Sequence, residues 1–165
     1  MKTSISLTIN GKTVRSAVEP RLNLADLLRE ELRLTATHLG CEQGVCGACT
    51  ILIDGQPARA CITLAVAADG ADVRTLEGLD QDELMGVLKD AFQDKHGLQC
   101  GFCTPGMLIS ARDLIQRKPQ LSDAEIRIAM SGNLCRCTGY QGIVRSIKSA
   151  ADNWAGRPDA TGGQG

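Results

Sequence analysis

The sequence predicts an α+β fold in which a strand-rich first half is followed by a helical second half. Residues 4–9 alternate apolar and polar side chains, which is typical of a half-buried strand. Beyond residue 83, apolar side chains recur at helical spacing. Each half also carries four of the eight cysteines. Together, these three observations predict two small domains, residues 1–77 and 80–155, each built around its own set of cysteines.

The start of the chain predicts a β-hairpin and a short helix. Asn10-Gly11 is a strong two-residue turn signal between a strand over 4–9 and a returning strand over 12–18. Asn23 is suited to cap a helix, because its side-chain oxygen can accept a hydrogen bond from a free N–H of the first turn. The apolar stripe of this helix consists of Leu24, Leu27, Leu28 and Leu32.

A second hairpin follows the first cysteine loop. Strands over 50–53 and 56–61 flank an Asp54-Gly55 turn, and a further strand is expected over 73–76. Strands, a helix and a cysteine loop in this order predict a small mixed sheet of the β-grasp ferredoxin kind.

The second half predicts a four-helix bundle with cysteine loops between its helices. Thr104 is a candidate N-cap with Pro105 at the first helical position, and residues 122–125 form a capping box. The residues expected to face inward are Leu84, Val87, Leu88, Ala91, Phe92, Ile126, Ala129, Met130, Ile143, Ile147, Ala150 and Trp154. The tail over 156–165 is rich in Gly, Pro, Asp and Thr and is expected to be disordered.

The cysteine loop of the first half has the most specific spacing, C-x4-C-x2-C with a fourth cysteine further on. Its ligand candidates are Cys41, Cys46, Cys49 and Cys61. The first three match the plant-type [2Fe–2S] spacing, and thiolates are the soft anionic ligands that such clusters need. Gly40, Gly44 and Gly47 are expected to supply positive φ and room beside the sulfurs. Structural zinc or disulfides are the alternatives, but zinc sites usually present paired knuckles.

The spacing of the second cysteine set is less diagnostic. Its members are Cys100, Cys103, Cys135 and Cys137. Zinc, a [4Fe–4S] cluster and a [2Fe–2S] cluster all remain open by spacing alone. Both pairs are expected at helix starts, where N–H groups and the positive dipole end stabilise thiolates. Glycines that would let the backbone approach a cluster are Gly101, Gly106, Gly132 and Gly139. The residues predict a second metal centre, and the iron–sulfur interpretation is favoured.

Composition narrows the class of protein. A net charge of −1 argues against binding of nucleic acid or of a membrane through a polybasic patch. The first residues show no export signal, and no apolar run approaches the roughly 18 residues of a membrane span. A cytoplasmic location is therefore expected, and eight cysteines in that compartment indicate metal binding. No nucleophile elbow, zinc-protease or phosphate-loop motif is present, so no catalytic residue is assigned.

Three segments, residues 40–50, 99–107 and 132–140, resemble the signature loops of the xanthine oxidase family of molybdenum hydroxylases. The resemblance spans residues 5–154, and the order and spacing of all eight cysteines agree with it. Within that family, the chain resembles the small iron–sulfur subunits of bacterial heterotrimeric members, such as carbon monoxide, isoquinoline/quinoline-type and aldehyde dehydrogenases. This resemblance implies a ferredoxin-like domain followed by a helical domain, each with one [2Fe–2S] cluster.

The resemblance further implies a role for each cysteine set. The first set would bind the plant-type cluster and the second set the other one. The second cluster would lie next to the molybdopterin of a large partner subunit, with Gln99 and the Cys137 region approaching that cofactor. The first cluster would pass electrons to FAD on a medium partner subunit. The implied assembly is a heterotrimer, or a dimer of heterotrimers, and the substrate of the complex is not specified by this chain.

Two other classes of function compete with this interpretation. A freestanding two-cluster ferredoxin would be a diffusible electron carrier, but a net charge of −1 gives little steering field for docking. A zinc-stabilised adaptor would be colourless, whereas an iron–sulfur protein is red-brown. His38 is expected to be an ordinary loop histidine rather than a ligand. Arg136, between two candidate ligands, would either offset cluster charge or be merely exposed.

Overall fold

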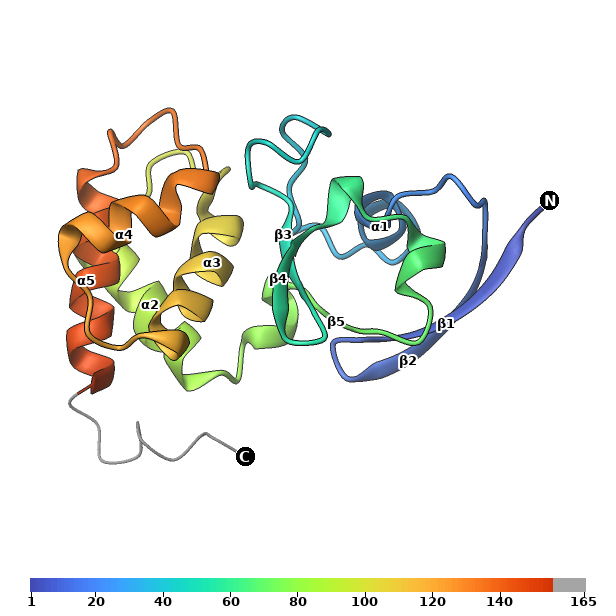
Figure 1. Ribbon diagram of the computed structural model, residues 1–165, viewed down its shortest axis with the longest axis horizontal. Coiled ribbons are helices and arrows are strands. Elements are labelled where there is room, and N and C mark those ends of the chain that lie inside the picture. The colour runs from blue at the N-terminus through green and yellow to red at the C-terminus, as the bar shows by residue number, and fades with distance from the viewer. Residues whose placement is uncertain (156–165) are drawn as a thin grey trace.

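The computed structural model describes residues 1–155 and shows two lobes side by side, a sheet lobe and a helical lobe (Figure 1). The strands are β1 (Thr3–Ile9), β2 (Lys12–Val18), β3 (Thr50–Ile53), β4 (Gln56–Arg59) and β5 (Asp72–Arg74). They form one sheet in the order β2-β1-β5-β3-β4. The β1–β5 pair is parallel and the other pairs are antiparallel, so the sheet is mixed as predicted.

Both predicted hairpin turns are confirmed. Asn10 and Gly11 have φ values of 50° and 78°, and Asp54 and Gly55 have 49° and 78°. Positive φ at both central residues is the requirement of a type I′ turn, which matches the twist of the flanking strands. The strands predicted over 4–9, 12–18 and 50–53 are therefore present with the expected register.

Two predicted strands end earlier than expected. β4 stops at Arg59, because the chain turns at once into a 3₁₀ turn over Ala60–Ile62 that carries Cys61. β5 stops at Arg74, because the next N–H, of Thr75, donates to the Asn10 side chain at 3.0 Å instead of to a strand. In the second case, a side chain from the β1–β2 turn replaces the partner strand.

The predicted short helix is α1 (Leu24–Asp26), which continues as a π-helical turn over Leu27–Glu31. Its N-cap is confirmed, since Asn23 Oδ1 accepts the Asp26 N–H at 2.8 Å. The apolar stripe of this helix packs on the sheet and belongs to the hydrophobic core of the sheet lobe. Leu24, Leu27 and Leu28 are fully buried there, and Leu32 lies at its edge.

The helical lobe contains α2 (Glu83–Asp94), α3 (Thr104–Arg117), α4 (Asp123–Ala129) and α5 (Gln141–Ala155). The predicted four-helix bundle and the Ser122–Glu125 capping box are confirmed. Most of the predicted inward residues are buried, whereas Val87 and Trp154 lie half-buried at the edge of the core. No helix in residues 1–155 combines the length and apolarity needed to cross a membrane. The expected disordered tail, 156–165, lies outside the described residues.

Two details of the helix predictions were wrong. Thr104 does not cap α3, because it already lies in the first helical turn; Cys103 is the N-cap residue and makes no side-chain cap hydrogen bond. Ala129 is exposed rather than inward, because Ile126 and Met130 form the buried face of α4 and turn Ala129 towards a cleft beside α3.

Asp82 connects two helices of the bundle. Its Oδ1 accepts the Met85 N–H at 2.8 Å and caps α2, and its Oδ2 accepts a hydrogen bond from Arg112 of α3 at 2.6 Å. Burial alone would raise the pKa of Asp82, but Arg112 and the Met85 N–H outweigh it and hold this pKa below its usual value. The carboxylate is therefore stabilised by the folded state.

We expect Asp82→Asn to lower the free energy of unfolding at pH 7 by about 2 kcal/mol, because asparagine still caps but the charged hydrogen bond is lost. The carboxylate's contribution is present above its unfolded-state pKa of about 4 and is lost as pH falls through its lower folded-state pKa. In urea titrations followed by helical circular dichroism, the difference from wild type should therefore shrink below about pH 4.

The matched control for this prediction is Asp80→Asn. Asp80 pairs with Lys89 at 2.7 Å but is 64% exposed. Exposed ion pairs contribute little to stability, so the free energy of unfolding of the control variant should fall by at most about 0.5 kcal/mol. Equal losses in the two variants, or a difference that does not change with pH, would contradict the role given to Asp82.

Candidate metal centres

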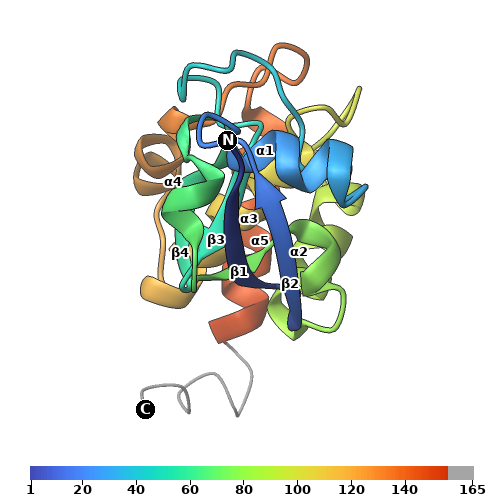
Figure 2. The ribbon, with the colours of Figure 1, turned by 90° about the vertical axis from the view of Figure 1, so that its right-hand side faces the viewer.

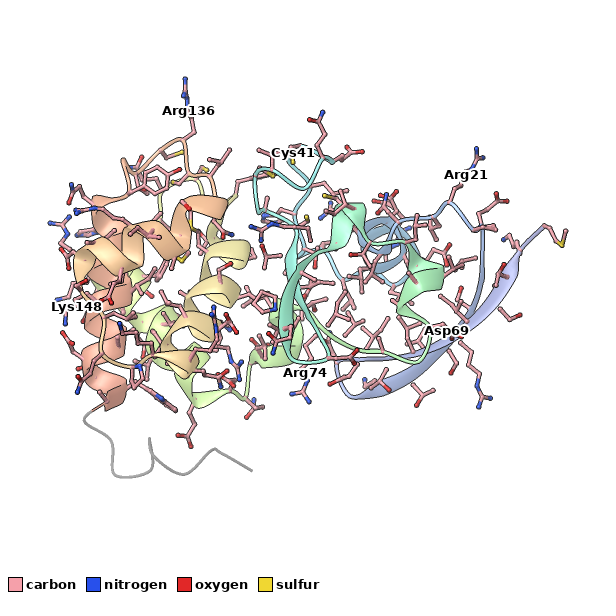
Figure 3. All side chains as sticks on the ribbon, in the orientation of Figure 1. Arg21, Cys41, Asp69, Arg74, Arg136 and Lys148 are labelled. Carbon is pink, nitrogen blue, oxygen red and sulfur yellow. The ribbon has the colours of Figure 1, made fainter. Side chains whose placement is uncertain are left out.

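All the cysteine-bearing loops gather at one end of the molecule. The loop over 40–49 leads into β3, the loop over 97–103 precedes α3, and the loop over 132–139 precedes α5. These loops lie together in both views (Figures 1 and 2), and Cys41 and Arg136 mark that end in Figure 3. Segments that are distant in sequence thus bring the two cysteine sets to neighbouring positions.

The thiols of the first set act on one another. Cys41 and Cys46 are half-buried, and the Cys46 thiol is one of the groups that lower the pKa of Cys41. Cys49 and Cys61 are buried, and after burial itself the Cys49 thiol is the next cause that raises the pKa of Cys61. Cys61 comes from the 3₁₀ turn after β4, which places it opposite the loop.

Electrostatics distinguishes Cys41 from Cys61. The backbone N–H groups of Cys46 and Gln43 point at the Cys41 sulfur, at 3.3 and 3.4 Å, and lower the pKa of this thiol to about 6. Burial raises the pKa of Cys61 to about 11. The outer part of the loop thus already offers N–H donors to an anionic sulfur, which is the environment that iron–sulfur clusters require.

The glycines of this loop serve two different needs. Gly44 and Gly47 each have φ of 76°, as expected. Gly40 does not have positive φ, so that part of the prediction was wrong; it provides space instead, since a Cβ there would lie 3.1 Å from the Cys46 sulfur. Glu42 also adopts positive φ, 54°, which the sequence did not indicate.

In the second set, thiols from different loops act on one another. The sulfurs of Cys100 and Cys137 are 3.4 Å apart at the exposed edge. Cys103 and Cys135 are half-buried, and after burial itself the Cys135 thiol is the next cause that raises the pKa of Cys103. The expected helix-start position is found for Cys103, directly before α3, whereas Cys135 and Cys137 lie in the loop that precedes α5 rather than at its first turn.

Hydrogen bonds again act on the sulfurs. The Phe102 N–H lowers the pKa of Cys100, and burial raises the pKa of Cys103 to about 12. Burial also acts to raise the pKa of Cys135, but the hydroxyl and N–H of Thr138 outweigh it and lower this pKa; the hydroxyl oxygen lies 3.1 Å from the sulfur. Thr138 is a supporting residue that sequence reasoning missed.

Tyr140 is a second supporting residue that was missed. Its phenolic oxygen accepts the Cys135 N–H at 2.9 Å, and its backbone has positive φ, 67°. Gly101 and Gly139 have positive φ of 80° and 61° and shape the same loops. The left-handed backbone of Tyr140, directly after Gly139, could not be read from the sequence.

The remaining two predicted glycines serve another purpose. A Cβ at Gly106 would overlap the Gly47 carbonyl of the other lobe, and a Cβ at Gly132 would lie 3.0 Å from the Arg59 guanidinium. They allow close approach between the lobes, a role that the sequence did not indicate for Gly106 and Gly132.

Two contacts join the cysteine loops across the lobes. The Leu134 N–H donates to the Cys46 carbonyl oxygen at 2.8 Å. His38 stacks on Phe102 with ring centroids 4.9 Å apart, and its Nδ1 donates to the Phe102 carbonyl oxygen at 2.7 Å. His38 therefore bridges the lobes through Phe102.

The residues present fit a [2Fe–2S] cluster in each set. All eight cysteines are free thiols. In residues 1–155, no three His, Cys, Asp or Glu side chains converge on one point as ligands of a single ion. Each set supplies the four thiols that would hold one [2Fe–2S] cluster, and backbone N–H groups are directed at the Cys41 sulfur. When bound, such a cluster supplies reversible one-electron chemistry.

Comparison with protein families matches both halves of the chain. Residues 7–78 match the 2Fe-2S iron-sulfur cluster binding domain family, and residues 75–148 match the [2Fe-2S] binding domain family. The structure is similar to a chain of quinoline 2-oxidoreductase from Pseudomonas putida 86, with a TM-score of 0.86 and 55% identity, over 92% of this chain and 94% of that one. The predicted α+β fold, ferredoxin-like and then helical, is thereby confirmed.

Curated relatives point the same way. Caffeine dehydrogenase subunit gamma of Pseudomonas sp. (strain CBB1) is 56% identical over 150 residues, 89% of this chain and 90% of that protein. The nicotine 6-hydroxylase small subunit of Paenarthrobacter nicotinovorans is 49% identical over 149 residues, 90% of each chain. The chain therefore belongs to the xanthine oxidase family of molybdenum hydroxylases, as a small iron–sulfur subunit that binds two [2Fe–2S] clusters and transfers electrons within an oxidoreductase complex.

Proposed function

We propose that each cysteine set binds one of the two clusters, and that the domains extend over residues 1–77 and 80–155. The ligands of the plant-type cluster are Cys41, Cys46, Cys49 and Cys61, and those of the second cluster are Cys100, Cys103, Cys135 and Cys137. The observation that carries this assignment is the geometry of the outer sulfurs: backbone N–H groups are directed at the Cys41 sulfur, and the Cys100 and Cys137 sulfurs lie 3.4 Å apart although they come from different loops.

The proposed route of electrons begins at the second cluster. Gln99, Cys100 and Cys137 are exposed at its outer edge, and this edge faces the molybdopterin of a large partner subunit. Electrons then pass to the plant-type cluster and leave for FAD on a medium partner subunit. The hydrogen bond from Leu134 to Cys46 supports transfer between the two clusters, because it links their loops directly.

The proposed assembly is a cytoplasmic heterotrimer that pairs into a dimer of heterotrimers, with the substrate site on the large subunit. Relatives are named for caffeine, nicotine and quinoline, which are nitrogen heterocycles, so the proposed substrate of this complex is also a nitrogen heterocycle. A freestanding carrier gains no support, because the curated relatives considered above are named as subunits.

We expect the reconstituted chain to hold about four irons and four labile sulfides, because two [2Fe–2S] clusters contain that number. Electron paramagnetic resonance of the dithionite-reduced chain should show two distinct signals. Cys46→Ala should remove one signal and about half of the iron, and Cys103→Ala should remove the other. Stoichiometric zinc, or a single signal in the wild-type chain, would contradict the ligand assignment.

A further inference from the structure

The link between the two cluster loops depends on how the lobes are held. Leu134 N–H reaches the Cys46 carbonyl oxygen at 2.8 Å, and Leu134 directly precedes Cys135. One hydrogen bond thus stands between a ligand of the first set and a ligand of the second. A shift of one lobe against the other by an ångström or two would break this bond, since N–H···O bonds lengthen out of range quickly.

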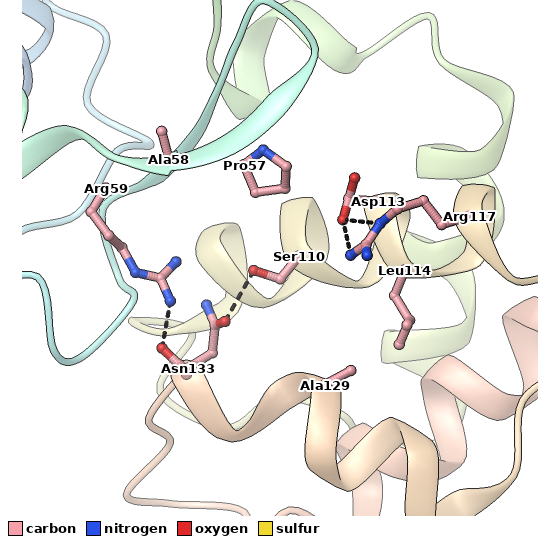
Figure 4. A pocket seen from close by; sticks show the side chains of 10 residues that line it. Pro57, Ala58, Arg59, Ser110, Asp113, Leu114, Arg117, Ala129 and Asn133 are labelled. Atoms are coloured by element: carbon pink, nitrogen blue, oxygen red, sulfur yellow. Dashed lines mark hydrogen bonds and ion pairs between the residues drawn. The ribbon is translucent and has the colours of Figure 1, made fainter.

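Arg59, the last residue of β4, crosses the cleft between the lobes (Figure 4). Its Nη2 donates to the Gly132 carbonyl oxygen at 2.7 Å, and its Nη1 donates to the Thr50 hydroxyl. The guanidinium group is planar and rigid, so it holds two acceptors at a fixed separation. It therefore ties the β3–β4 hairpin to the segment that leads into Cys135.

Asn133 makes the complementary connection from the other lobe. It is 3% exposed, its Nδ2 donates to the Gly47 carbonyl oxygen at 3.1 Å, and its Oδ1 accepts from Ser110 of α3 at 3.0 Å (Figure 4). The Thr50 hydroxyl donates to the same Gly47 oxygen at 2.6 Å. A buried amide that loses such partners is costly, so this arrangement has little freedom to change.

Close packing between the loops also restricts the movement of one lobe against the other. A Cβ at Gly47 would lie 2.5 Å from the Gly132 carbonyl oxygen, so the backbones of the two loops are already in contact. Hydrogen bonding and packing therefore both fix the same two segments, one on each side of the Leu134–Cys46 bond.

We propose that Arg59 and Asn133 are positioning residues that set the separation and orientation of the two clusters, and thereby the rate of electron transfer between them. The inference rests on the proposed assignment of the clusters to the two cysteine sets. Both residues act through the backbone of the cluster loops, and neither belongs to the proposed ligand sets.

The test uses the full chain reconstituted with both clusters and fully reduced. Each reduced cluster is then paramagnetic, and magnetic interaction between them splits or broadens the resonance signals in a way that depends on their separation and orientation. Arg59→Met should keep the iron content but lose the splitting or broaden it. Asn133→Ala should have the same effect. Intercluster transfer measured by rapid mixing should slow in both variants.

The matched control is Arg74→Met. Arg74 ends β5, which is separated from β4 by β3 in the sheet, and it pairs with Asp72 at 3.3 Å in an exposed position, so its loss should leave the splitting unchanged. Arg59→Lys keeps the charge but replaces the fork by a single donor group, and an intermediate splitting is expected from it.

Unchanged splitting in Arg59→Met and Asn133→Ala, an equal loss in Arg74→Met, or an unsplit wild-type spectrum would overturn the inference. So would loss of a cluster in both Arg59 variants, which would show a general structural role. Failure of the proposed function looks different, because the wild-type chain would then hold zinc or a single cluster.

Discussion

Cys41→Ala in the assembled complex is expected to abolish flavin reduction while reduction of the second cluster by substrate continues. In the proposed route, removal of a plant-type ligand eliminates the last carrier before FAD and leaves the earlier one in place. The half-buried Cys41 lies on the sheet lobe, away from the bundle core, so the second cluster should retain its signal. Rapid-freeze resonance spectroscopy after addition of substrate would follow both clusters and the flavin.

Cys103→Ala tests the earlier step of the route. It should stop electrons before either the plant-type cluster or the flavin is reduced. Gln99→Ala, at the exposed edge, should slow the first transfer but leave the plant-type signal intact. Flavin reduction at the normal rate in Cys41→Ala, after its cluster is lost, would show that the proposed order of transfer is wrong.

Gly106→Ala is expected to destabilise the protein by about 1–3 kcal/mol, although alanine normally favours a helix over glycine. The added methyl group would overlap the Gly47 carbonyl of the facing loop, so α3 and the sheet lobe would have to separate. The matched substitution is Gly86→Ala in α2, where the new Cβ meets nothing within 4 Å. That change should raise the free energy of unfolding of the protein by about 0.5–1 kcal/mol.

Urea unfolding of the two alanine variants, followed by circular dichroism, would test this contrast of sign. The cluster signals of Gly106→Ala should also lose their magnetic splitting, because the same contact holds the loops together. Stabilisation of both variants to a similar extent would mean that the lobes do not touch at Gly106.

Much of this fold could be predicted because its signals are local. Alternation over 4–9, the Asn10-Gly11 turn and the capping box at Ser122 each depend on residues close in sequence, and all were found where expected. Strand ends were less predictable. β5 stops where the Asn10 side chain accepts the Thr75 N–H, and this partner lies 65 residues away in sequence.

The candidate site was predictable in composition but not in arrangement. Spacing identified the eight cysteines, yet it did not indicate that the Cys100 sulfur lies beside that of Cys137, because the two come together only when two loops meet. The supporting roles of Thr138 and Tyr140 were missed for the same reason. Glycines were assigned to the cofactor although Gly106 in fact serves the contact between lobes.

The strand β3 has neighbours on both faces. Ile51 is buried in the core of the sheet lobe, and Leu52, the next residue, is buried in the core of the helical lobe. Successive side chains of a strand point to opposite faces, so this one short strand contributes buried side chains to both cores. Neither core can open without exposing the same backbone. We therefore expect thermal unfolding to be cooperative across both halves, with one melting transition shared by the two cofactor environments rather than two.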